Sequence, residues 1–281
     1  MRKMSKDQTE EEFLKNYNPR GYDPMAITSD ILILSVSNKE SENYRKLDEK
    51  QFSVLLVKRE THPFKGKWCL PGGFIGVNET LDEAAKRILR EETNLKNIYL
   101  EQLYTFSDVD RDPRMRILST AYMSLIDKNM LEDKLFENAK WFDLTVKEKE
   151  IKPGKSEIYI LLENGEVFIE FELEKIRKEE TSNIYEYKIR KNDKLAFDHP
   201  LVIATGIDRL KNKVEYTDVV FNMMPEYFTL RELQQVYESI LGRELIVPDF
   251  RRRIKDKVEK TEQIAKGAGH RPSALYRYKR N

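Results

Sequence analysis

The stretch PGGFIGVNETLDEAAKRILREETNL, residues 71–95, places two glycines directly before an acidic, amphipathic segment. Thr80 and Glu83 have the spacing of a capping box, which predicts a helix that begins at about Leu81. Asn94 tolerates left-handed backbone and suits the end of that helix. Glycines let a ligand approach the backbone closely, and Mg²⁺ is bound by carboxylates together with phosphate oxygens. The stretch therefore predicts a loop and helix that hold a cation and a phosphate chain.

Short apolar segments on both sides of this helix predict the strands of a sheet. Residues 26–36 (AITSDILILSV) and 52–58 (FSVLLVK) are rich in β-branched or aromatic residues and are short enough for buried strands. Further strands are expected at about 99–106, 115–126 and 139–143. Strands that alternate with a helix predict an α/β (α+β) sandwich.

Residues 157–190 predict a β-meander, because two alternating segments flank the hairpin signal Asn164-Gly165. From Asp198 the pattern becomes helical. The last 80 residues then predict a separate unit, in which Thr229 and Glu232 form a second capping box.

Gly242 suits the end of the helix that this capping box starts. A short turn leads to the basic segment FRRRIKDKVEK, so two helices joined by a tight turn are expected. The terminal TEQIAKGAGHRPSALYRYKR predicts two strands around a glycine-rich tip. Helices followed by a basic hairpin predict a winged helix.

The loop and helix of residues 73–95 resemble a Nudix box. The matching positions are Gly73, Glu79, Arg87, Leu89, Glu91, Glu92 and Leu95. Asn94 replaces the final glycine of the motif, which is a mild change. Ile88 replaces the first glutamate of the motif and cannot ligate a metal. At about 100° per residue, Ile88 lies on the same helix face as Glu91 and Glu92.

The resemblance implies that Glu91 and Glu92 are the metal ligands and catalytic residues, with Mg²⁺ or Mn²⁺ as the cofactor. Because Ile88 removes one carboxylate, we expect the chain to bind a nucleotide diphosphate and to hydrolyse it weakly or not at all. An active Mg²⁺-dependent Nudix hydrolase of the ADP-ribose pyrophosphatase type is the alternative.

The loop SDVDRDPRMR (residues 107–116) resembles the ligand loop of ADP-ribose-directed Nudix proteins. Its arginines and the glycine loop supply most of the expected ligand contacts, which are Arg59, Gly72, Gly73, Glu79, Arg114 and Arg116. Arg59 is equally consistent with a surface arginine. Arg111 is a further possible phosphate contact, Asp112 is either an extra metal ligand or part of a polar loop, and His199 is expected to be structural.

The order of the two units is similar to that of the Nudix-related transcriptional regulators. This resemblance implies an N-terminal arm (1–20), a Nudix domain (21–195) that is an α/β/α sandwich with a mixed sheet, and a winged-helix DNA-binding domain (196–281). It also implies ADP-ribose or a related nucleotide as effector, control of NAD or sugar metabolism, and a homodimer on a two-fold operator in double-stranded DNA.

The expected DNA contacts lie on the basic helix and on the wing. They are Arg251, Arg252, Arg253, Lys255, Arg271, Tyr276 and Lys279. Residues 248–281 contain eleven Lys or Arg and four Asp or Glu, a net charge of +7, in a chain whose total is +1. A basic end on an acidic body favours a polyanionic partner, although charge alone is equally consistent with a solvated tail.

Cys69 is the single cysteine, which excludes an internal disulfide and fits a reducing cytoplasm. The longest apolar runs are too short to span a bilayer, and the first residues do not have the apolar centre of a secretion signal. We therefore expect a cytoplasmic protein without a membrane partner.

Overall fold

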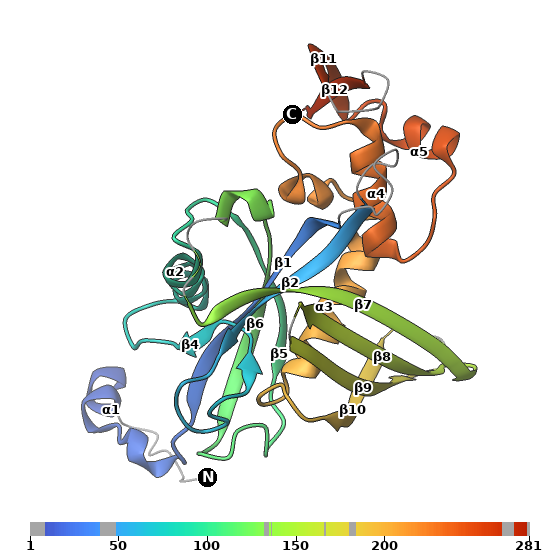
Figure 1. Ribbon diagram of the computed structural model, residues 1–281. Helices are drawn as coiled ribbons and strands as arrows, with labels where there is room; N and C mark the ends of the chain where they lie inside the picture. The colour runs from blue at the N-terminus through green and yellow to red at the C-terminus, as the bar shows by residue number, and fades with distance from the viewer. Residues whose placement is uncertain are drawn as a thin grey trace.

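The computed structural model describes residues 9–39, 49–131, 135, 137–165, 167–179, 184–265 and 273–279. A large curved sheet with a helix on each face forms the body, and a smaller helical unit with a two-stranded hairpin lies at one end (Figure 1). The predicted α/β fold with a C-terminal winged helix is confirmed.

The strands of the large sheet follow the order β10-β9-β8-β7-β2-β1-β6-β5, with β3 beside β2 and β4 beside β1. Their bounds are β1 Ala26–Lys39, β2 Glu49–Lys58, β3 Trp68–Cys69, β4 Gly72–Phe74, β5 Tyr99–Phe106, β6 Ile117–Leu125, β7 Ala139–Lys152, β8 Lys155–Asn164, β9 Val167–Arg177 and β10 Tyr185–Asn192. β1 runs parallel to β6 and antiparallel to β2 and β4, so the sheet is mixed, as predicted.

Helix α2 (Leu81–Thr93) covers one face of the sheet beside β1. Both arms of the predicted capping box are present, since Thr80 accepts from the Glu83 amide and Glu83 accepts from the Thr80 amide. Asn94 ends the helix with φ 53°, in the left-handed region that was expected of it. The inner side of α2 packs into an apolar cluster with strands β1 and β2, formed by Ala85, Ile88, Leu89, Ile31, Ile33 and Leu55.

The segment predicted as a β-meander continues the same sheet instead of forming a separate layer. β7 passes from the centre of the sheet into β8, and Asn164 pairs with Val167 to close the β8–β9 hairpin. Gly165 in this turn has φ +53°, which glycine adopts without strain. The inward side chains Leu162, Ile169 and Phe171 are fully buried, and each contributes about 1.5–3 kcal/mol by the transfer of its apolar surface from water.

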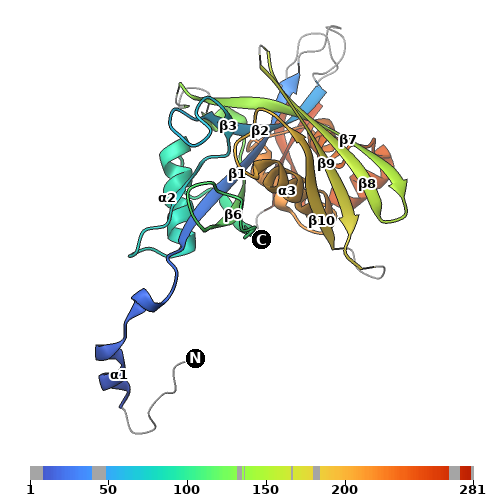
Figure 2. The same ribbon diagram turned by 90° about the horizontal axis from the view of Figure 1, so that it is seen from below.

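Helix α3 (His199–Lys213) lies on the other face of the sheet and contacts β1, β5, β9 and β10. Because β5 and β10 are the two ends of the sheet order, the sheet curves around this helix (Figures 1 and 2). Gly206 makes the closest approach, since a Cβ there would lie 2.0 Å from Leu32 Cδ2. α3 is therefore packed directly on the central strand β1.

The C-terminal unit contains the short helix η3 (Val219–Met223), α4 (Leu230–Leu241), α5 (Val247–Ile254) and the hairpin of β11 (Val258–Ala265) and β12 (Ser273–Tyr278). The second predicted capping box is present at Thr229 and Glu232, and Gly242 ends α4 with φ 69°. The backbones of Phe228 and Tyr276 exchange two hydrogen bonds of 3.0 and 2.8 Å. These bonds fix the wing to the start of α4.

Helix α3 lies beyond the predicted boundary at residue 196, yet it packs on the large sheet and also contacts α4. The boundary between the two domains remains a prediction. At the other end of the chain, α1 (Glu10–Asn16) and the turn η1 (Pro19–Gly21) extend away from the body (Figure 2). η2 (Lys128–Leu131) follows β6. The helices of the described segments include none long and apolar enough to cross a membrane.

Candidate functional site

A cavity of about 390 Å³ opens where the end of β2, the glycine loop, α2 and the start of α3 meet. Five of the residues predicted as ligand or metal contacts line it, namely Arg59, Gly72, Gly73, Glu92 and Arg114. They come from four separate segments of the chain, which the fold brings together. Glu79, Glu91 and Arg116 are not among the residues that line this cavity.

The arginines of the cavity lie against aromatic rings. The Arg59 guanidinium lies 4.9 Å from the centre of the Phe197 ring, and its Nε donates to the Pro63 carbonyl at 2.7 Å. The Arg114 guanidinium lies 5.2 Å from the Phe74 ring and 6.0 Å from the Phe197 ring. Guanidinium groups bind phosphate oxygens in pairs, and the rings offer flat apolar surface. The cavity therefore suits a ligand that carries both phosphate and a ring.

Gly72 and Gly73 differ in how tightly they are enclosed. A Cβ at Gly72 would lie 2.3 Å from Asp30 Oδ1 and 3.1 Å from the Ser29 carbonyl oxygen. A Cβ at Gly73 would lie 3.5 Å from the Ile88 side chain, which is an ordinary contact. Of these two glycines, Gly72 is therefore the one whose replacement by any residue with a Cβ causes a clash.

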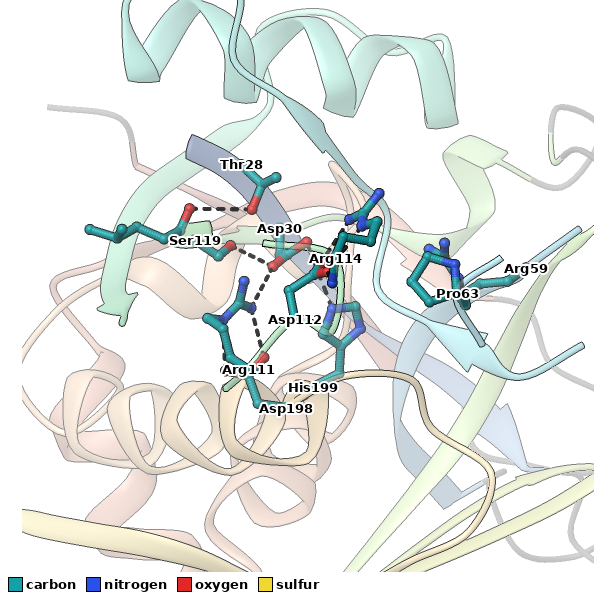
Figure 3. A network of polar contacts seen from close by, with 11 residues as sticks. Thr28, Asp30, Arg59, Pro63, Arg111, Asp112, Arg114, Ser119, Asp198 and His199 are labelled. Atoms are coloured by element: carbon teal, nitrogen blue, oxygen red, sulfur yellow. Dashed lines mark hydrogen bonds and ion pairs between the residues drawn. The ribbon is translucent and has the colours of Figure 1, made fainter. Parts of the chain in front are cut away.

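A buried ionic network forms one wall of the cavity (Figure 3). Arg111 donates two hydrogen bonds to Asp198, at 2.9 and 2.7 Å, and its Nη2 lies 3.5 Å from Asp30 Oδ2. Asp30 also accepts a hydrogen bond of 2.5 Å from Ser119. The Arg111 side chain is only 3% exposed, so the two carboxylates compensate a charge that would otherwise be costly to bury.

His199 is held in the same wall by the glycine loop. Its Nδ1 accepts a hydrogen bond of 2.8 Å from the Leu70 amide, which leaves the proton of the neutral ring on Nε2, 3.7 Å from Asp30. Burial lowers the pKa of His199, so the ring stays neutral at pH 7. The predicted structural role of His199 agrees with this contact, and the residue also lines the cavity.

Sequence patterns did not identify Asp30, Phe197 or Asp198 as part of the site. One local signal was present for Asp30, since a carboxylate within an apolar strand is unusual without a partner. Phe197 has φ 51°, a backbone conformation that is uncommon for a bulky residue and that sequence does not reveal. Cys69 lines the cavity as well, and burial raises the pKa of its thiol to about 12, so it is inert.

Two of the predicted acidic residues are engaged by Arg87. Glu79 accepts from Arg87 at 2.7 and 3.0 Å and from the Gly76 amide at 2.7 Å, and these bonds lower its pKa to about 2. Arg87 also lies 3.2 Å from Glu91, whose side chain is 58% exposed. Glu79 thus connects the glycine loop to α2 instead of facing the cavity.

Glu92 is the carboxylate of α2 that reaches the cavity, and burial together with the charge of Glu91 raises its pKa. Ile88 is 3% exposed and lies in the apolar cluster beneath Gly73, so it supplies no oxygen ligand. Groups of three or more potential metal ligands are absent from the described segments. This end of α2 therefore offers at most two carboxylates, Glu92 in the cavity and Glu91 outside it, so an ion here would take its other oxygens from water and a bound diphosphate.

The remaining predicted ligand contact, Arg116, lies apart from the cavity. Its Nη2 donates to the Ser107 carbonyl at 2.8 Å, which closes the loop between β5 and β6. Asp112 is bound by Arg114 at 2.8 and 3.0 Å and is not a free metal ligand.

Four of the predicted DNA contacts surround a groove of about 390 Å³ between α5 and the wing. Arg251, Arg252, Lys255 and Tyr276 all line it. Arg251 and Lys255 are exposed, and Arg252 is 82% exposed while its guanidinium lies 2.8 Å from Asp249. A groove with three outward cations beside an aromatic ring suits a phosphate backbone. Lys279 is exposed just after β12, whereas Arg271 lies outside the described residues.

Arg253 faces the protein, unlike its two neighbours on α5. It donates to the Val214 carbonyl and lies 3.1 Å from Glu215, both just after α3. Its guanidinium also lies 5.0 Å from the ring of Tyr237 in α4. These contacts occupy the Arg253 guanidinium within the chain, and its contact with DNA remains a prediction.

Comparison with known proteins matches both units. Residues 44–162 match the NUDIX domain, and residues 220–278 match the NrtR DNA-binding winged helix domain. A curated relative, the "ADPR responsive transcriptional repressor NtrR" of Acinetobacter baylyi, is 31% identical over 276 residues, which are 96% of this chain and 88% of that protein. The ADP-ribose pyrophosphatase of Methanocaldococcus jannaschii is 38% identical over 97 residues, 34% of this chain and 57% of that protein.

Solved structures that resemble almost the whole chain include the following two. A MutT/nudix family protein from Enterococcus faecalis has 26% identity and a TM-score of 0.68, covering 98% of this chain and 95% of its own. Shewanella oneidensis NrtR complexed with a 27mer DNA has 27% identity and a TM-score of 0.63, covering 90% of this chain and 93% of its own.

Proposed function

Because this chain belongs to the family of Nudix proteins that carry an NrtR winged helix, we propose that it is an ADP-ribose-responsive transcriptional repressor. The relative from Acinetobacter baylyi, whose name states that function, aligns with nearly all of this chain. The proposal places the chain in the cytoplasm and assigns ADP-ribose to the cavity beside α2 and DNA to the groove beside α5.

The observation that carries the ligand assignment is the composition of the cavity wall. Arg59 and Arg114 offer cations for a diphosphate, Gly72 lines the cavity with backbone that carries no side chain, and Phe74 and Phe197 offer rings for the apolar faces of the nucleotide. Mg²⁺ or Mn²⁺ would be held by Glu91 and Glu92 together with the diphosphate oxygens. A bound ion would neutralise part of the diphosphate charge.

Binding without efficient turnover follows from the position of Ile88. A third carboxylate at this point of α2 would complete the acidic face, but the structure has an apolar side chain there, packed under the glycine loop. Loss of a group that assists proton transfer lowers rates by about 10²–10⁴-fold. We therefore propose a receptor for ADP-ribose, with hydrolysis weak or absent.

The DNA-binding half of the proposal rests on the groove between α5 and the wing. Arg251 and Arg252 extend outward from α5, the second helix of the helix-turn-helix. In this motif the second helix lies in the major groove, where its side chains can reach base edges and phosphates. Two copies related by a two-fold axis would read a two-fold operator. A homodimer is therefore part of the proposal.

A gel shift with and without ADP-ribose tests ligand binding and DNA binding together. The probe is a duplex isolated from a random-sequence pool by its binding to the purified protein, and the titration is repeated at several salt concentrations. We expect salt-dependent binding, with an affinity that ADP-ribose changes by at least about fivefold. Binding that salt does not affect, or that ADP-ribose leaves unchanged, contradicts the proposal.

The alternative function is an active ADP-ribose pyrophosphatase, and the presence of Glu92 in the cavity favours it. Product formation from ADP-ribose with Mg²⁺ or Mn²⁺ separates the two functions. Robust turnover that Glu92→Gln abolishes would establish the enzyme, whereas turnover near the background rate supports the receptor.

A further inference from the structure

Helix α3 begins in the wall of the ligand cavity. Phe197 presents its ring to the cavity directly before the helix, and Asp198 precedes its first residue, His199. Arg111 connects Asp198 at this end of α3 to the cavity, because it lines the cavity and donates two hydrogen bonds to Asp198 (Figure 3). An anionic ligand at Arg111 would compete with Asp198 for the same guanidinium.

The helix itself is a rigid connection. Its 15 residues span about 22 Å at 1.5 Å per residue. Val202, Ile203, Ile207 and Leu210 are buried along its length, and Gly206 lies against Leu32 of β1. A continuous helix packed in this way shifts as a unit, because packed interfaces move between discrete arrangements.

The other end of α3 holds the DNA-binding unit. The Val214 carbonyl accepts from Arg253 of α5, and Glu215 lies 3.1 Å from both Arg253 and Arg243. A few residues on, Asp218 forms an ion pair with Lys257. The residues just after α3 therefore hold α5, the helix that carries Arg251 and Arg252.

There is space for the DNA-binding unit to change position. A cavity of about 810 Å³ lies between the ends of the β5 and β6 strands and the segment of η3 and β12, with Tyr99, Leu125, Phe221 and Pro225 among its lining residues. α4 contacts both α3 and β2, and η3 contacts β6, so the cavity leaves room for small shifts of η3 and β12 beside these contacts.

We propose that α3 transmits occupancy of the cavity to α5, with Asp198–Arg111 as the input contact and Glu215–Arg253 as the output contact. The proposal rests on the function proposed above. A phosphate bound at Arg111 weakens its pair with Asp198, α3 shifts against β1, and Glu215 moves α5 relative to the sheet. The ligand changes DNA affinity because it binds one arrangement of α3 better than the other.

The output contact is tested with the full-length protein, ADP-ribose and the selected duplex. The coupling factor is the ratio of the DNA dissociation constants measured with and without saturating ADP-ribose. Glu215→Gln preserves shape but removes the charge that holds Arg253. Arg243→Gln is the matched control, because Arg243 lies at a similar distance from Glu215 but lies outside α5 and is 63% exposed.

We expect Glu215→Gln to bring the coupling factor to within about twofold of one, from a wild-type value of at least about fivefold. Its ADP-ribose affinity, measured by calorimetry, stays at the wild-type value, and Arg243→Gln keeps the wild-type coupling factor. A Glu215→Gln protein with wild-type coupling overturns the role of α3 while the proposed function stands. A wild-type protein without coupling overturns the proposed function itself.

If Glu215→Gln does not fold, the coupling factor of Arg253→Lys tests the same contact. Lysine retains the charge of Arg253 but cannot bind the Val214 carbonyl and Glu215 in the same way. The input contact is tested separately by Asp198→Asn, which removes the competing charge. We expect this variant to bind ADP-ribose at least as tightly as wild type and to lose coupling. Binding weakened more than about tenfold, or coupling retained, contradicts competition at Arg111.

Discussion

Replacement of Ile88 by glutamate tests whether this residue separates binding from turnover. The side chain is 3% exposed and packs in the apolar cluster of α2, β1 and β2. Removing its apolar surface from the core costs about 1.5–3 kcal/mol, and enclosing a carboxyl group there costs about 1–3 kcal/mol more. Together these effects lower Tm by roughly 10 °C in a chain of this size. The substitution thus destabilises the apo protein even where it restores a carboxylate.

Bound Mg²⁺ and ADP-ribose should offset this loss of stability only when residue 88 is a glutamate. Ile88→Gln is the matched control, because it has the same length and polarity without the charge. With Mg²⁺ and ADP-ribose together, the Tm of Ile88→Glu should rise by several degrees more than that of Ile88→Gln, since Mg²⁺ joins carboxylates to diphosphate oxygens. Hydrolysis of ADP-ribose should be gained by Ile88→Glu alone.

Thermal unfolding with and without Mg²⁺ and ADP-ribose, together with chromatography of the products, measures both effects. Equal Mg²⁺ responses of Ile88→Glu and Ile88→Gln would refute the reasoning about the metal. Loss of less than about 1 kcal/mol in both variants would refute the reasoning about the core. Wild-type hydrolysis as fast as that of Ile88→Glu would show that Ile88 does not limit turnover.

Three further outcomes follow from the geometry. Gly72→Ala should weaken ADP-ribose binding at least about tenfold in calorimetry, because its Cβ would meet Asp30, whereas Gly73→Ala should change it far less; equal effects would contradict this. Burial depresses the pKa of His199 in the folded state, so the neutral ring favours folding. The contribution of His199 to the free energy of unfolding is therefore complete above pH 6.5. As the pH falls below 6.5, this free energy decreases by up to about 1.4 kcal/mol per pH unit. Denaturant unfolding should show this slope in wild type and not in His199→Asn, which keeps the hydrogen-bond acceptor. Arg251→Gln should reduce the slope of log affinity for DNA against log salt by about one, and an unchanged slope would exclude a phosphate contact.

Features encoded within a few residues were predictable from the sequence. Both capping boxes and the left-handed ends at Asn94 and Gly242 occur where expected, because each depends on local hydrogen bonds and backbone conformation. The loop and helix of the Nudix box likewise depend on a short, fixed spacing. The succession of strands and helices along the chain, first the sheet and then the winged helix, follows from the apolar periodicity, which indicates the type of each element.

Contacts between distant segments were not predictable in this way. Arg111 and Asp198 are 87 residues apart, and nothing in either segment indicates that they form a pair. Arg251 and Arg253 are equivalent in sequence, but only one faces outward, because the helix turns by about 100° per residue and the residues just after α3 bind Arg253 on the inner side. Glu79 matched its motif position and yet binds Arg87 of α2 instead of facing the cavity.

The measurement that tests the central claim most directly follows DNA binding and ADP-ribose consumption in one reaction. The wild-type protein is titrated onto the selected duplex with and without ADP-ribose and Mg²⁺, and the nucleotide is recovered at the end. We expect the DNA affinity to change by at least about fivefold while the recovered ADP-ribose remains intact. DNA affinity that does not change, or ADP-ribose converted to AMP during the assay, would contradict a ligand-gated regulator.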